Sequence, residues 1–75
     1  MADRISTRNL VNAMRAVGFV DKSRYGSHLV LRHQSTGLLL TIPTDRSFVP
    51  VVHIQAIKQQ LRNYRIEVPH LFDAF

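Results

Sequence analysis

The chain has 75 residues, of which 45% are hydrophobic, and it contains no cysteine. This length predicts a single domain over residues 1–75, and the lack of cysteine excludes disulfide frameworks, thiolate metal sites and cysteine nucleophiles. The formal net charge of +5, from ten basic and five acidic residues, is typical of small domains that bind a polyanion.

The hydropathy pattern predicts a protein of the cytoplasm. The N-terminal residues 1–4 lead into no apolar signal segment, and apolar runs such as Leu38-Leu39-Leu40 are far too short to span a membrane. A secreted domain of this size usually needs disulfides. We therefore expect no membrane partner and a cytoplasmic location.

The first predicted element is an amphipathic helix over residues 6–17. Leu10, Met14 and Val17 recur at helical spacing and form one apolar stripe. Ser6 or Thr7 is placed to cap its start, and the glycine at position 18 is typical of a left-handed C-terminal cap. The polar face carries three side chains: Arg8, Asn12 and Arg15.

Three short strands follow, at about residues 19–23, 27–33 and 38–42. Glycine-containing turns at residues 24–26 and 34–37 separate them, which predicts an antiparallel meander. Alternation in the middle strand places Leu29 and Leu31 on one face. The opposite face should carry three side chains: His28, Val30 and Arg32.

Residues 43–49 are predicted to form a loop before a second helix over residues 50–64, with Pro50 at its first position. The apolar stripe of this helix has four members: Ile54, Ile57, Leu61 and Tyr64. A short helical turn at residues 69–72 should then pack Leu71, Phe72 or Phe75 on the core. The order α-β-β-β-α predicts an α+β fold in which two helices cover one face of a three-stranded antiparallel sheet.

His28 is the candidate catalytic residue, because it begins a strand after a glycine turn and faces away from the predicted core. An imidazole can take or give a proton near neutral pH, which RNA cleavage by the ribose 2′-hydroxyl requires. Arg32, on the same face, is predicted to hold a phosphate. Lys22 or Arg24 on the neighbouring strand would help to stabilise its developing charge.

The other histidines favour no second site. His33 has the opposite parity to His28, which argues against a two-histidine nuclease and against a metal site built on the pair. We place His33 at the strand end beside the turn. His53 and His70 have no partner at a metal-binding spacing and are interpreted as structural or exposed.

Four short segments together resemble the HicA (YcfA-like) mRNA interferase family. They are Gly18-Phe19-Val20, Gly26-Ser27-His28, Arg32-His33 and Leu40-Thr41-Ile42-Pro43, and the match extends over about residues 8–72. The resemblance implies a fold similar to the double-stranded-RNA-binding domain. It also implies metal-independent and cofactor-free cleavage of mRNA with the G-S-H histidine, here His28, as the catalytic residue. The implied partner is a HicB-type antitoxin that covers the active face.

The chain departs from the family pattern at three places. Arg24 and Tyr25 precede the G-S-H instead of the common lysine, and we interpret Tyr25 as packing in the turn, with stacking on a base as the alternative. The loop after the third strand has a single cation, Arg46. The segment after the second helix lacks the usual glycine, so Asn63 is the candidate for a left-handed turn.

Two other functions fit the sequence. A non-catalytic RNA-binding module, or a degenerate toxin with the same fold, would read RNA by shape and phosphate contacts without cutting it. A protein-binding domain would use the open sheet face as its interaction surface. The sequence leaves the oligomeric state open.

Overall fold

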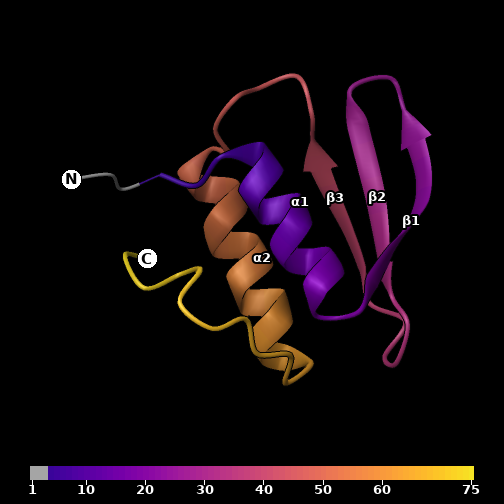
Figure 1. Cartoon of the computed structure of the whole chain (residues 1–75), viewed down its shortest axis with the longest axis vertical. Coiled ribbons are helices and arrows are strands. Elements are labelled where there is room, and N and C mark those ends of the chain that lie inside the picture. The colour runs from indigo at the N-terminus through magenta and orange to yellow at the C-terminus, as the bar shows by residue number, and fades with distance from the viewer. Residues whose placement is uncertain (1–3) are drawn as a thin grey trace.

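A computed structural model describes residues 4–75. The prediction that the N-terminus leads into no signal segment also rests on residues 1–3, which lie outside the described residues. Figure 1 shows the predicted order of a helix, three strands and a second helix. The elements are α1 (Thr7–Ala16), β1 (Phe19–Tyr25), β2 (His28–His33), β3 (Leu39–Pro43) and α2 (Val51–Asn63). The α+β class with one three-stranded antiparallel sheet is confirmed.

The strand register divides the sheet into two faces, because directly paired residues project to the same side. We call the side that packs on α1 the helix face; it includes Phe19, Leu29, Leu31, Leu40 and Ile42, which are all buried. We call the other side the open face. Its three rows across the strands are Tyr25–His28–Pro43, Ser23–Val30–Thr41 and Val20–Arg32–Leu39. The predicted alternation in β2 is therefore confirmed.

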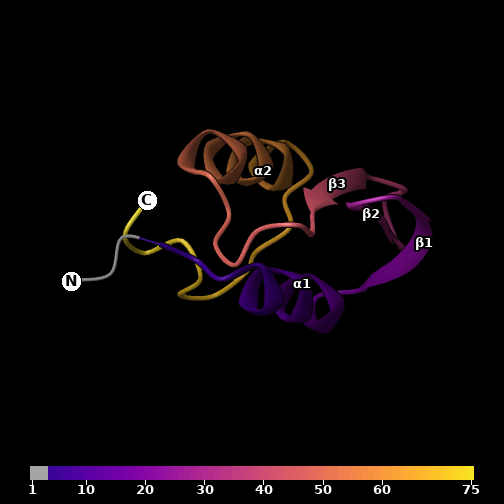
Figure 2. The ribbon, with the colours of Figure 1, turned by 90° about the horizontal axis from the view of Figure 1, so that it is seen from above.

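Helix α1 lies beneath the helix face (Figure 2), where Leu10 and Met14 are fully buried. Ser6 caps its start as predicted, with Oγ accepting a hydrogen bond of 3.0 Å from the Asn9 N–H. The chain leaves α1 through Gly18, whose φ of 106° is unfavourable for any residue with a side chain. A Cβ at Gly18 would also lie 3.3 Å from His33 Nε2, so this turn requires glycine for two reasons.

Helix α2 lies beside strand β3 (Figure 2) and contributes Ile54, Ile57 and Leu61 to the same core. Tyr64, the fourth member of the predicted stripe, is instead 48% exposed. Pro50 is the N-cap of α2 and not its first helical residue. No helix within residues 4–75 has the length and apolar character needed to cross a membrane.

The segment after α2 differs from the prediction in its backbone. Arg65, and not Asn63, adopts the left-handed conformation, with φ of 56°, and the Ile66 N–H donates to the Leu61 carbonyl at 2.9 Å to close the helix end. Residues 69–72 form turns and not a helical turn, because His70 has a φ of 64°. The predicted packing of this segment is confirmed for all three apolar side chains: Leu71, Phe72 and Phe75.

A β-bulge shifts the register of β1 between Asp21 and Ser23 and leaves Lys22 without a partner in β2. Strand β1 consequently continues to Tyr25, two residues beyond its predicted end. The predicted turn at residues 24–26 is wrong, because Arg24 and Tyr25 are paired in the sheet and the reversal is made by residues 26–27.

Candidate functional site

His28 is the first residue of β2 and is exposed on the open face. Its register partners are Tyr25 on β1 and Pro43 on β3. Next to this row the Thr44 N–H donates to the Ser27 carbonyl at 2.6 Å, which ties the end of β3 to the turn before β2. Two of the four segments singled out in the sequence, Gly26-Ser27-His28 and Leu40-Thr41-Ile42-Pro43, therefore meet at one end of the sheet.

Arg32 is exposed on the same open face as predicted, in the row with Val20 and Leu39. Arg32 is four residue steps along the extended strand from His28, which places their Cα atoms ~13 Å apart. Val30, which is only 9% exposed, lies between them. At this separation the two side chains are placed to meet different groups of an extended ligand.

Arg24 does not join His28. It pairs with Leu29 and therefore projects from the helix face, where it lines a pocket of about 360 Å³ between α1 and the sheet. We call this the arginine pocket; its polar lining is Thr7, Arg8, Asn12, Arg15, Arg24 and Thr44. Lys22, at the bulge, is exposed. Of the three predicted RNA-binding residues, the register thus places Arg32 on the open face with His28, Arg24 on the helix face and Lys22 at the bulge without a partner.

Tyr25 lies next to His28 and is 65% exposed. The interpretation that it packs in the turn is wrong, because the turn begins one residue later and the ring projects from the open face. An exposed aromatic ring beside a catalytic candidate offers a flat surface for a nucleobase. The sequence feature that could have revealed this pairing is the spacing of three residues between Tyr25 and His28, which fits a hairpin with a two-residue turn.

His33 is a structural residue, buried on the helix face at the end of β2. Its Nε2 lies 2.9 Å from the Val17 carbonyl and its Nδ1 lies 2.9 Å from the Thr36 hydroxyl. Because a carbonyl only accepts, Nε2 carries the proton and donates it. The ring also packs against Phe19, with centroids 4.8 Å apart. The prediction that His33 and His28 occupy different faces is confirmed.

The two remaining histidines are exposed and lie on separate elements. His53 is on α2, and His70 is in the C-terminal segment with Nδ1 at 3.1 Å from Asp73. Within residues 4–75 no group of three or more histidine or acidic residues is close enough to hold a metal ion.

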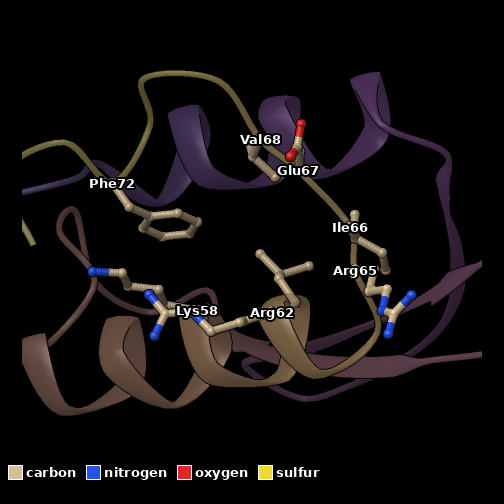
Figure 3. A pocket seen from close by; sticks show the side chains of 8 residues that line it. Lys58, Arg62, Arg65, Ile66, Glu67, Val68 and Phe72 are labelled. Carbon is tan, nitrogen blue, oxygen red and sulfur yellow. The ribbon is translucent and has the colours of Figure 1, made fainter.

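A second pocket, of about 460 Å³, lies between α2 and the C-terminal segment. Figure 3 shows Phe72 and Val68 on that segment facing Lys58 and Arg62 on α2. Two of its cations are on α2: Lys58 donates to the main-chain oxygen of Phe75, and Arg62, in the last turn, offsets the negative end of the helix dipole. They therefore have a structural explanation, and the pocket does not include His28.

Comparisons with protein-family models, with curated proteins and with solved structures found no match for this chain.

Proposed function

We propose that the chain is the toxin of a type II toxin–antitoxin system in the cytoplasm, a HicA-like endoribonuclease that cuts mRNA with His28. The observation that carries this proposal is the position of His28, exposed on the open face and directly opposite Pro43. That pairing joins two of the four segments that resemble the HicA family, Gly26-Ser27-His28 and Leu40-Thr41-Ile42-Pro43. The order α-β-β-β-α also fits the double-stranded-RNA-binding fold that the resemblance implies.

The chemistry assigned to His28 is general acid–base catalysis without a metal. The neutral imidazole takes the proton of a ribose 2′-hydroxyl as the oxygen attacks the adjacent phosphorus. The bond from phosphorus to the 5′-oxygen breaks, and that oxygen takes a proton from water or a second acid. The products are a 2′,3′-cyclic phosphate and a 5′-hydroxyl. A well-placed base supplies about 10²–10⁴-fold in rate.

The neighbours of His28 fit roles in binding the RNA strand. Tyr25 stacks on a base beside the scissile phosphate. Because the Cα atom of Arg32 is ~13 Å from that of His28 along β2, Arg32 holds a neighbouring phosphate of the strand.

The proposed partner is a HicB-type antitoxin that covers the open face. This face carries exposed apolar side chains, Val20 and Leu39, on either side of Arg32 in one row. A partner that buries them would block access to His28. The net charge of +5 favours a less basic or acidic partner.

A non-catalytic RNA-binding module is the second candidate. The observation that favours it is the separation of Arg24 from His28 by the sheet, which removes one cation predicted to stabilise the transition state. Such a module would bind RNA with a strong salt dependence and leave it intact.

The products of the reaction test the proposal. A defined mRNA should be cut in EDTA to fragments ending in 2′,3′-cyclic phosphate, and a single 2′-deoxy substitution at the cut site should abolish that cut. Intact RNA that nevertheless binds would favour the module. Cleavage at the deoxy position would contradict attack by the 2′-hydroxyl.

A further inference from the structure

The arginine pocket has three cationic side chains, which line it between α1 and the helix face of the sheet. Arg8 and Arg15 come from α1 and Arg24 comes from β1. Among residues 4–75, no aspartate or glutamate contributes to the lining. Within residues 4–75, neither Arg8 nor Arg24 forms a salt bridge. The charge of Arg24 helps to lower the pKa of Asp21, but Arg24 forms no ion pair with that carboxyl, so Arg8 and Arg24 both keep their N–H donors for an anion from outside the chain.

Arg15 is held in place by Asp21. Its Nε and Nη2 atoms donate to the two carboxylate oxygens at 3.0 Å and 2.8 Å. These hydrogen bonds lower the pKa of Asp21 and raise the pKa of Arg15, so the pair stays charged. A guanidinium has five N–H donors, and the donors that Asp21 does not use remain available. Arg15 is therefore a pre-oriented donor at the wall of the pocket.

The start of α1 and two neutral side chains add to the pocket's preference for an anion. Thr7 and Arg8 are the first two residues of α1, and the first turn of this helix carries no acidic residue. The first turn thus offers no carboxylate to offset the positive end of the helix dipole, while Ser6 Oγ and the Ser47 carbonyl accept from the Asn9 and Thr7 N–H groups. The Asn12 amide and the Thr44 hydroxyl line the same pocket and can each donate a hydrogen bond.

The arginine pocket and His28 lie at the same end of the sheet on opposite faces. Arg24 adjoins Tyr25, which pairs with His28, and Leu29 in the pocket lining follows His28 directly. Only the turn at residues 26–27 separates the two faces there. A strand that passes around this turn can present one phosphate to His28 and another to the pocket.

We infer that the arginine pocket binds a backbone phosphate of the RNA strand that passes His28. The inference rests on the proposed function, since it takes the ligand to be RNA. A planar guanidinium can donate two parallel hydrogen bonds to the oxygens of a phosphate. Three guanidinium groups offer more donors than the two oxygens of a carboxylate ligand can accept, which favours phosphate. The pocket would anchor the strand on the far side of the turn and fix which linkage lies beside His28.

The first test follows backbone amide signals by NMR while inorganic phosphate is added to the full chain, with acetate as the matched anion. Phosphate should shift the signals of Thr7, Arg8, Asn12 and Thr44. The double variant Arg8→Gln/Arg24→Gln should weaken this binding at least tenfold, whereas Arg62→Gln, which also removes an exposed cation, should leave it within twofold. Equal shifts with acetate, or equal weakening by Arg62→Gln, would overturn the inference.

The second test uses a 2′-O-methyl oligoribonucleotide, which the proposed chemistry cannot cut. For the double variant, the slope of log affinity against log salt should fall by about 0.7, the value for one phosphate contact on a single strand. If the pocket binds free phosphate but not RNA, the slope will be the same for the parent and the double variant, and that result would overturn the RNA assignment. This readout does not depend on catalysis, so a chain that fails to cleave RNA can still pass it.

Discussion

Pro43 on β3 lies directly opposite His28 on β2. Proline has no N–H to donate to a neighbouring strand, so it is tolerated where a strand ends. Here it closes β3 beside the exposed imidazole, and Thr44 then bonds back to the turn before β2. The position of the catalytic candidate is thus fixed by the sheet on both sides.

Arg32→Ala should weaken RNA binding without unfolding the chain, because its exposed side chain contacts solvent on the open face. Loss of one phosphate contact predicts roughly a tenfold lower affinity at low salt and a salt slope smaller by about 0.7. Fluorescence anisotropy with a labelled oligonucleotide at several salt concentrations measures both. If Arg62→Ala, which removes a cation from α2, has the same effect, then only general charge is involved.

Tyr25 should bind RNA through its ring and not through its hydroxyl. Tyr25→Phe keeps the ring and should retain the parent affinity, whereas Tyr25→Ala should lose about 1–3 kcal/mol, the usual contribution of one stacked base. Isothermal titration with a non-cleavable oligonucleotide measures the difference. Equal affinities of the Phe and Ala variants would show that no base stacks there.

His33→Ala should destabilise the fold severely. It leaves the Val17 carbonyl and the Thr36 hydroxyl without their partner and opens a cavity beside Phe19. The expected cost is on the order of 2–4 kcal/mol, a large part of the roughly 3–5 kcal/mol available to a domain of this size. Urea unfolding measures it, and His53→Ala is the exposed control. Matching midpoints for the two variants would contradict the structural role.

Asp21→Asn should lower the thermal midpoint slightly at neutral pH and low salt, by about 5 °C at most, because the ion pair with Arg15 is exposed. The folded-state pKa of Asp21 is lowered by Arg15, so its contribution is present above the unfolded pKa. That contribution disappears as the pH falls through the folded pKa. The parent and the variant should therefore melt together in strong acid and in high salt. A difference that persists there would have another cause.

The sequence predicts the elements well and the site only in part, and the bulge in β1 explains why. Alternation correctly places His28 and Arg32 opposite Leu29 and Leu31, because β2 is regular. The extra residue at Lys22 reverses the parity of everything after it in β1. No residue at this bulge marks it in the sequence, so Arg24 could not be assigned to the helix face beforehand.

The residue that adopts the left-handed conformation after α2 is a second feature that the local sequence does not predict. Propensity favours asparagine for this conformation, and Asn63 was the natural candidate. The helix instead continues through Asn63, and Arg65 takes the strained backbone because the following segment returns over the core. Tertiary packing of residues 66–75 decides the position of the turn, and the local sequence does not reveal it.

The most direct test compares three proteins, the parent, His28→Ala and His53→Ala, on one defined mRNA in EDTA. His53 is also exposed, so its variant controls for the loss of a surface histidine and for contaminating nuclease. We predict cleavage by the parent and by His53→Ala, and a rate at least ~100-fold lower for folded His28→Ala, which should still bind RNA. Equal cleavage by all three, or RNA binding without cleavage by any of them, would contradict catalysis by His28.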